Sequence, residues 1–286
     1  MTDFDARLTR PAGIRSLRLG DTKVTYVPDG LVQLSPRGWL PATTDEVWAA
    51  HPEYLDADGY LVGGVGGLLV EHGDRALLID AGFGPVAVPA VPGRPIGRIE
   101  GGTLFDHLTA LGRPPATLEA VAITHLHGDH VGWSPRLAAA GVTHLVAEPE
   151  WKQRHLAAEH GVPAEALTAM ASDLRTVTDG EEIFPGVRAH FTPGHTVGHA
   201  AYVITGGGRR LVAFGDAMHS PLQVAHPDWS AVVDHDPAQS AVFRRDLVTQ
   251  LSEPDTLGFG IHFADVPFGR ARRTADGGVA WEAVDE

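Results

Sequence analysis

Three apolar segments of this chain each end directly in a cluster of side chains that can bind metal ions. Residues 118–124 run into the hexapeptide HLHGDH. Residues 187–191 are followed by TPGHTVGH, and residues 210–214 by GDAMH. A rigid sheet can position reactive groups on the loops where its strands end. The sequence therefore predicts a sheet-based fold in which several strand ends contribute to one site.

The hexapeptide HLHGDH holds four side chains that can bind a metal within six positions. In an extended segment His125 and His127 point the same way, because side chains alternate along a strand. Gly128 permits a backbone turn that other residues resist, and the turn would direct Asp129 and His130 towards a second position. Ligands divided in this way favour a pair of metal ions about 3.5–4 Å apart. A histidine-rich capped turn is the structural alternative, but it gives no reason for an aspartate between the histidines.

The segment THLHGDHVG resembles the HxHxDH signature of the metallo-β-lactamase superfamily. The resemblance implies an α/β fold, a four-layer αβ/βα sandwich with metal ions bound at its rim. It also implies a histidine after a TPG turn, an aspartate at a later strand end and a histidine near the C-terminus. The chain supplies these three side chains, in the expected order, as His195, Asp216 and His262.

The resemblance further implies two metal positions, each with three ligands of its own and one shared carboxylate. The ligands of the first position would be His125, His127 and His195. Those of the second would be Asp129, His130 and His262, and Asp216 would bridge both. Because no ligand is missing, two divalent ions are expected. The chain has no cysteine, so nitrogen and oxygen donors must bind them, which suits zinc first and also manganese, iron or cobalt.

Paired metal ions of this kind are typical of hydrolases. Two dications acidify a shared water enough to leave hydroxide near neutral pH. The resemblance therefore implies that a metal-bridging hydroxide attacks an electrophilic carbonyl or phosphoryl centre, while one metal takes up the negative charge that develops. Asp129 is predicted to orient the attacking water. The chain contains no GxSxG motif, and no serine nucleophile is required.

Three further polar side chains adjoin the predicted ligands. Asp80 ends a strand and, by the resemblance, would accept a hydrogen bond from a metal-bound imidazole, although a turn aspartate is the alternative. His199 follows His195 by four residues and is interpreted as structural. His219 stands three residues after Asp216, where related acyl-homoserine lactonases carry a substrate-contacting tyrosine. This histidine is predicted either to donate a proton to the leaving group or to line the pocket.

Several aromatic residues lie next to the loops that should border the metals. They could shape an apolar substrate pocket or belong to the ordinary core: Trp39, Tyr60, Phe83, Trp133 and Phe263. The nine remaining histidines match no ligand position and are interpreted as surface or core residues.

The segment DHDPAQSAVFRR, residues 234–245, carries a second and weaker resemblance. With the preceding GDAMHSPLQVAHPDW, it is similar to the branch that contains methyl parathion hydrolase and its lactonase-like relatives. This likeness implies an ester, lactone or organophosphate of a small molecule as substrate. It does not identify the substrate.

Three other functions remain open on the same residues. A nuclease would normally present a basic surface, whereas the formal net charge here is −14, so no nucleic-acid partner is expected. An iron-dependent thiol dioxygenase would use one metal and would not need the second ligand set. A non-catalytic metal-binding scaffold would hold the ions without turnover.

The remaining predictions concern the chain as a whole. Strand runs alternating with helices through 286 residues predict a single domain over residues 1–286. The first residues have no apolar core of signal-peptide length, and no stretch is long enough to span a bilayer. A cytoplasmic protein without a membrane partner is therefore expected, and a homodimer is compatible with the resemblance.

Apolar runs bounded by turn residues predict the individual elements. Turn signals at residues 20–21 and 29–30 divide residues 17–34 into three short strands. Further strands are expected at residues 65–71, 76–80, 118–124, 187–191, 200–204, 210–214 and 258–261. Helices are expected over residues 102–111 and from residue 236 or 240 to residue 251. Proline and glycine dominate residues 85–98, which are interpreted as an exposed loop.

Overall fold

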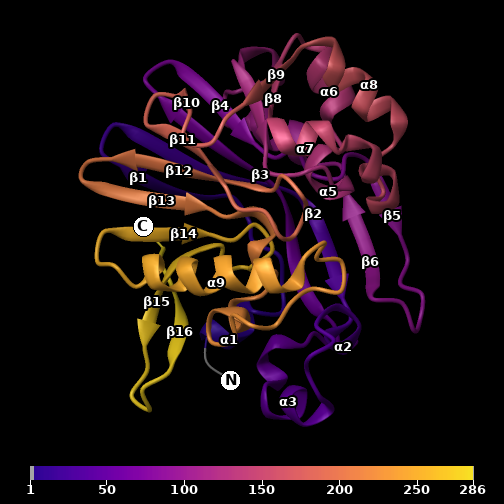
Figure 1. Cartoon of the computed structure of the whole chain (residues 1–286), viewed down its shortest axis with the longest axis vertical. Coiled ribbons are helices and arrows are strands. Elements are labelled where there is room, and N and C mark those ends of the chain that lie inside the picture. Colours follow the sequence, from indigo (N-terminus) through magenta and orange to yellow (C-terminus); the bar gives the residue numbers. More distant parts are fainter. Residues whose placement is uncertain (1–2, 286) are drawn as a thin grey trace.

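Two mixed β-sheets form the centre of the structure, a computed structural model that describes residues 3–285 (Figure 1). The spatial order of the first sheet is β5 (Val86–Val88), β6 (Ile96–Gly101), β2 (Thr22–Leu34), β3 (Leu61–His72), β4 (Arg75–Ile79), β7 (Ala120–Ile123), β8 (Thr143–Ala147) and β9 (Leu174–Val177), with β1 (Arg15–Leu19) paired to β2. The order of the second is β10 (Glu182–Phe184), β11 (Val187–Phe191), β12 (Ala200–Gly206), β13 (Arg209–Ala213), β14 (Thr256–Phe259), β15 (Phe268–Arg273) and β16 (Val279–Ala283).

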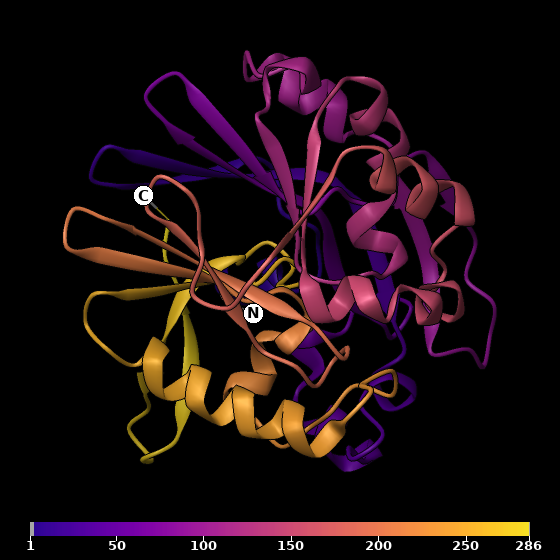
Figure 2. The ribbon, with the colours of Figure 1, turned by 45° about the horizontal axis from the view of Figure 1, so that its top comes forward.

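Helices cover the outer faces of both sheets (Figure 2). Those against the first sheet are α4 (Leu104–Ala110), α6 (Ser134–Ala139), α7 (Glu148–Lys152) and α8 (Ala164–Ser172). The long helix α9 (Pro237–Leu251) packs on the second sheet through Leu247 and Leu251. Short helices occur at α1 (Asp3–Arg7), α2 (Pro36–Trp39), α3 (Asp45–Ala50) and α5 (Gly128–Val131). The αβ/βα order of layers expected from the family resemblance is confirmed.

The strand β3 shows why such a sheet is stable between two layers. Its side chains alternate, so Leu68 and Val70 face the second sheet whereas Leu69 faces the helices. All three are fully buried. A strand buried on both faces needs an uninterrupted apolar run, which is the pattern of residues 65–70.

The predicted turn at residues 29–30 is wrong. β2 continues through these residues, and a β-bulge lies between Pro28 and Gly30. The Asp29 carboxylate accepts hydrogen bonds from Gly84 N and Trp133 Nε1 instead of forming a turn. A Cβ atom on Gly30 would meet Glu100 O at 1.8 Å, so the glycine permits a close approach of two strands.

The interpretation of residues 85–98 as an exposed loop is wrong in part. β5 and β6 form a hairpin there, and β6 pairs with the edge of β2. Pairing with a strand far away in the sequence overrides the local preference of a segment rich in proline and glycine. The hairpin consequently becomes one wall of the cavity described below.

Strand direction brings the ends of several strands to one edge of the molecule. β4 and β7 are parallel neighbours in the first sheet. β13 and β14 are parallel neighbours in the second, and β11 runs in their direction because two antiparallel pairings separate it from β13. The carboxyl ends of parallel strands lie at the same edge of a sheet. None of the helices within residues 3–285 is both long and apolar enough to cross a bilayer.

Candidate metal centre

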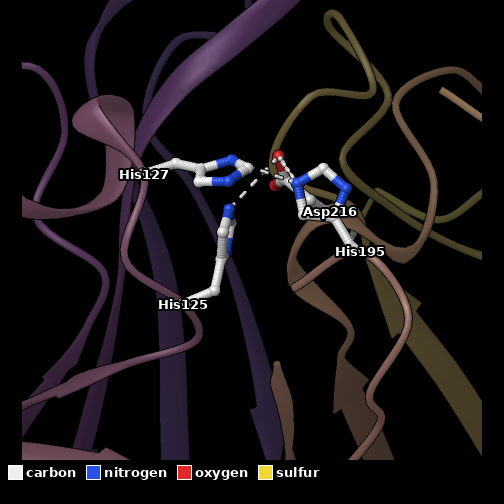
Figure 3. A group of neighbouring side chains, drawn as sticks. All are labelled: His125, His127, His195 and Asp216. Atoms are coloured by element: carbon white, nitrogen blue, oxygen red, sulfur yellow. Dashed lines mark hydrogen bonds and ion pairs between the residues drawn. The ribbon is translucent and has the colours of Figure 1, made fainter. Parts of the chain in front are cut away.

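The first group of potential metal ligands contains His125, His127, His195 and Asp216. Their nitrogen and oxygen atoms all lie within 4.8 Å of one another, and all four side chains are buried. Figure 3 shows the three rings and the carboxylate directed towards a common centre. His125 and His127 come from the loop after β7, whereas His195 and Asp216 follow β11 and β13. Both sheets therefore contribute to this group.

The second group contains Asp129, His130, Asp216 and His262, again with ligand atoms within 4.8 Å of one another. Asp129 and His130 lie in the short helix α5, where the chain turns after His127. Asp216 belongs to both groups, with its Oδ1 3.0 Å from His130 Nε2 and its Oδ2 3.4 Å from His195 Nε2. The structure thus brings together all seven side chains that the sequence predicts as ligands.

The chemistry of these donors fits two divalent ions. Among the seven predicted ligands, three buried imidazole nitrogens have no hydrogen-bond partner within residues 3–285, namely Nε2 of His125, His127 and His130. A buried polar atom without a partner is destabilising, and a metal ion would satisfy it. Histidine nitrogens and aspartate oxygens are ligands that zinc and similar ions accept.

The charge states of the group support the same conclusion. Burial lowers the pKa of His125 well below its usual range, and the neighbouring His130 and His127 lower it further. A neutral imidazole is the form that binds a metal. Burial opposes ionisation of Asp216, but the surrounding histidines, His130 and His262 first, hold the pKa of its carboxyl well below the usual range. The centre therefore offers a neutral ring at His125 beside an ionised carboxylate. That carboxylate in turn raises the pKa of His130 and His262, whose protons a bound metal ion would displace.

A hydrogen-bond network orients the ligands of the first sheet. Asp80 Oδ2 accepts a hydrogen bond from His130 Nδ1 at 2.9 Å. Thr124 Oγ1 donates to the same carboxylate and accepts from His125 Nδ1 at 3.0 Å. Asp80 thus stands beside the centre, as the resemblance implies, rather than in a simple turn. Fixing the outer nitrogen of a histidine sets which ring nitrogen is free for the metal.

Two buried carboxylates that the sequence analysis did not single out as site residues hold the other ligand loops. Asp234 Oδ1 accepts a hydrogen bond from His195 Nδ1 at 2.7 Å. Glu150 accepts hydrogen bonds from Leu126 N and Gly198 N, each at 2.8 Å, so it ties the two loops together. The DHDP segment was noted only as a family marker, and Glu150 in EPEWK resembles an ordinary exposed helix residue. Only the spatial contacts identify either one.

His199 lies beside the centre but in neither ligand group. Its Nδ1 contacts Thr192 Oγ1 at 2.7 Å, and its Nε2 accepts a hydrogen bond from Asp216 N at 3.2 Å. Burial lowers the pKa of His199 to about 3, so the ring is neutral and can accept this bond. The interpretation of His199 as a structural histidine agrees with these contacts.

His219 is fully enclosed at the edge of the centre. Its Nε2 lies 3.1 Å from Asp216 Oδ2, and its Nδ1 has no hydrogen-bond partner within residues 3–285. The ring packs edge-on against Trp39, with 5.0 Å between ring centroids, and stacks on His262. His219 also lines the cavity, so part of its ring borders the space open to a bound molecule.

A cavity of about 660 Å³ opens above both ligand groups. Its floor is formed by His127, Asp129, Asp216, His219 and His262. Its apolar walls include Val32, Leu34, Trp39, Phe83, Pro85, Val86, Ile96, Ile99 and Val233. No lysine or arginine of the described chain lines it.

The aromatic residues singled out in the sequence divide into two sets around this cavity. Trp39 and Phe83 line it. Trp133 and Phe263 belong to the core, where Trp133 stacks on Phe105. Tyr60 also lies outside the cavity lining. His160, interpreted as a surface or core histidine, stacks on His127 and lines the cavity.

The amino-acid sequence is similar to a known protein family and to several curated proteins. Residues 62–258 match the family model of the metallo-beta-lactamase superfamily. A lactamase-like protein, vrtG, from Penicillium aethiopicum is 28% identical over 144 residues, which cover 50% of this chain and 40% of that protein. A probable metallo-hydrolase of Mycobacterium tuberculosis is 26% identical over 181 residues, covering 53% and 56%. The chain therefore spans about half the length of the curated relatives it matches.

Similarity to solved structures extends over nearly the whole chain. The dizinc quorum-quenching lactonase AidC, solved with the product N-hexanoyl-L-homoserine, matches with a TM-score of 0.81. The match covers 96% of this chain and 98% of AidC at 21% sequence identity. At this identity, the likeness establishes a shared fold.

Proposed function

The chain belongs to the metallo-β-lactamase superfamily, and from this membership and its two adjoining ligand groups we propose that it is a dinuclear metal-dependent hydrolase of small, uncharged esters, lactones or phosphotriesters. The observation that carries the proposal is the sharing of Asp216 between two groups of ligands at the floor of an apolar cavity.

In this proposal, His125, His127 and His195 would hold the first ion, and Asp129, His130 and His262 would hold the second. Asp216 belongs to both ligand groups and would serve both ions. Two divalent ions at these positions, zinc in the first instance, would acidify a water and polarise the oxygen of the bond to be cleaved. The protein holds the donors in place through buried hydrogen bonds to their outer atoms.

Asp129 and His219 are the residues proposed to act on water and substrate. The Asp129 side chain is 19% exposed and lines the cavity, so its carboxylate can orient a water by accepting a hydrogen bond. His219 lines the cavity beside the shared Asp216 and is proposed to donate a hydrogen bond or a proton to the leaving group. Trp39 packs against this ring and fixes its plane.

The cavity supports the proposed substrate class. Aliphatic and aromatic side chains favour an apolar substituent, and no lysine or arginine of residues 3–285 lines the cavity to pair with an anionic one. AidC, which shares the fold, was solved with an acyl-homoserine product, so its cavity accepts an uncharged acyl chain. A nuclease would need basic side chains along the cavity to bind phosphates, so the lining disfavours that function. A thiol dioxygenase needs one iron, so the complete second ligand group disfavours that function.

A screen of chromogenic esters, lactones and phosphotriesters tests the proposal. The metal-free protein should be inactive, and added zinc, manganese or cobalt should restore hydrolysis of at least one class. Each neutral ester should be paired with an analogue that ends in a carboxylate. Faster turnover of the neutral member is expected because no lysine or arginine in the described part of the chain lines the cavity walls to receive the charge. Metal-loaded protein that hydrolyses none of the three classes would contradict the proposal.

A further inference from the structure

The segment DHDPAQSAVFRR contains a buried cation that the proposed mechanism does not use. We propose that Arg244 is a positioning residue for the first metal position, where it acts through Asp234 to hold His195 with its Nε2 directed at the ion. This inference rests on the proposed function only in requiring that the centre bind metal. It concerns metal affinity, which can be measured without a substrate.

Arg244 is among the largest fully buried side chains of the described chain, with an exposure of 1%. Removing a guanidinium from water is unfavourable unless charged and polar groups surround it. Its Nη1 lies 3.2 Å from Asp234 Oδ2, and its Nε donates to Pro227 O at 2.6 Å. Its Nη2 donates to Ser230 Oγ at 2.5 Å. The donors of this guanidinium are therefore used by three residues of the loop that precedes helix α9.

Asp234 connects the guanidinium to the metal centre. Its side chain is fully buried, and its two oxygens serve different partners. Oδ2 faces Arg244, whereas Oδ1 accepts the hydrogen bond from His195 Nδ1 at 2.7 Å. Because His195 Nδ1 carries the proton of this bond, Nε2 is the ring nitrogen that a metal ion would bind. That Nε2 lies 3.4 Å from Asp216 Oδ2, inside the first ligand group.

No other ligand in the described residues has an acceptor that is itself paired with a buried arginine. His262 Nδ1 donates to a backbone carbonyl, Gly64 O, at 2.8 Å. His125 Nδ1 donates to the hydroxyl of Thr124. A carboxylate held in one orientation by a guanidinium is a more rigid acceptor than a hydroxyl that can rotate. The first position thus depends on a support that the second lacks.

Arg244 also contacts the segment of the shared ligand, since Nη1 lies 3.4 Å from Ala217 O, next to Asp216. The start of the same helix is attached to the His195 loop by two backbone hydrogen bonds. His235 N donates to His195 O, and Asp236 N donates to Gly194 O. Helix α9 therefore anchors both second-sheet ligands of the first position, and Arg244 is the side chain that joins them.

Zinc titration of the metal-free protein against a chromophoric chelator tests this role. The variants are Arg244→Met, Arg244→Lys and Asp234→Asn. The control is Arg245→Met, because Arg245 is the next residue of the helix, is exposed and forms an ion pair with the exposed Asp228. Arg244→Met and Asp234→Asn should weaken one of the two zinc-binding steps about 10- to 100-fold and leave the other unchanged. Arg244→Lys, which keeps the charge, should recover part of the loss, and Arg245→Met should leave both steps unchanged.

A double variant distinguishes positioning from ordinary packing. If Arg244 acts through Asp234, the pair of changes should weaken zinc binding no more than Asp234→Asn alone. The visible spectrum of the cobalt-loaded protein should change for Arg244→Met, because His195 would be reoriented, and should stay the same for Arg245→Met. Should Arg244→Met not fold, Asp234→Asn and Arg244→Lys carry the test.

Three results would overturn the inference: equal weakening of both steps, no weakening of either, or additive losses in the double variant. A wild-type chain that binds no zinc, manganese or cobalt would overturn the proposed function together with it. Normal two-step binding that the variants leave intact would overturn the positioning role alone.

Discussion

Individual residues of the metal centre differ in how many metal positions they serve. Asp216 is common to both ligand groups, whereas His127 belongs to the first group only. Both are buried at the floor of the cavity. The two side chains therefore permit different tests of the proposed pair of ions.

Replacing His127 by alanine is expected to abolish hydrolysis and to remove about one metal equivalent, since the remaining donors bind an ion far more weakly. Asp216→Ala should lower the content of both metals. Elemental analysis of purified protein and turnover of the screened substrate measure the two effects. The control is His155→Ala, an exposed histidine outside both groups, which should keep the wild-type values. Normal activity in His127→Ala would refute the ligand assignment.

The sequence could predict the seven side chains that converge, because their spacing follows strand ends and a glycine turn. It could not predict Glu150 or Asp234 as their supports. Each acts on a loop that is distant along the chain, and their partners are often backbone N–H groups, which leave no trace in residue identity. Contacts of this kind follow from the packing of the two sheets rather than from a motif.

At the scale of secondary-structure elements, the long apolar strands could be predicted from the sequence. The bulge in β2 and the β5–β6 hairpin could not. The bulge at Asp29 has the composition of a turn, and the β5–β6 hairpin has that of a loop. In both, the deciding interaction is a pairing with a distant strand. Helix α9 shows the opposite case, since Asp236 caps it by accepting from Ala238 N and Gln239 N, one of the two starts expected.

Helix α7 offers a test of how ligand loops are held. Glu150→Gln keeps the size of the side chain but has one acceptor oxygen where the carboxylate has two, so one buried N–H loses its partner. The expected loss in the free energy of unfolding is about 2 kcal/mol, together with weaker zinc binding. Urea unfolding of the metal-free protein measures the first effect.

The matched control is Glu148→Gln on the same helix, where the exposed carboxylate pairs with the exposed Lys152. Its expected change in stability is within about 0.5 kcal/mol. An equal loss of unfolding free energy in both variants would show that the hydrogen bonds from the two ligand loops to Glu150 add no stability beyond that of an exposed helix carboxylate.

Strand β8 contains a buried histidine that should make the fold sensitive to acid. Both ring nitrogens of His144 lack a hydrogen-bond partner within residues 3–285, and burial lowers the pKa of His144 to about 4. Because the folded-state pKa lies below the unfolded value of about 6.5, this residue costs no stability above pH 6.5. As the pH falls from about 6.5 to 4, the unfolded chain gains the proton first, and up to about 3 kcal/mol of stability is lost.

His144→Leu is expected to reduce this acid sensitivity. Urea unfolding of the metal-free wild type and variant at pH 7 and pH 4.5 gives the comparison. On going from pH 7 to pH 4.5, the free energy of unfolding should fall less in the variant than in the wild type. The other histidines titrate in both proteins, so their effect cancels in this comparison. A difference that is independent of pH would contradict the assignment of a neutral, buried ring.

At the scale of the whole molecule, the centre joins the two sheets. His125, His127, Asp129 and His130 follow β7 of the first sheet, and the ligands after β11, β13 and β14 belong to the second. Ions bound there would hold two packed layers together. Their binding free energy therefore adds to the stability of the complete fold and to no isolated half.

Removal of the metals should accordingly lower the unfolding temperature. At a free zinc concentration 100 times the dissociation constant, each site contributes about 2.7 kcal/mol. Thermal unfolding with a chelator and with added zinc measures the difference, and the double variant His127→Ala with His262→Ala should show little response to either. An unchanged unfolding temperature in the wild type would argue against metal binding by the folded chain.

The order of the ligands along the chain also determines when each position becomes complete during synthesis on the ribosome. The first group ends at residue 216, whereas the second also needs residue 262, which follows α9 and β14. A nascent chain therefore possesses every donor of one position before it possesses those of the other. Loading of the ions is expected to be sequential, with the second ion entering only after the last strands have emerged and docked.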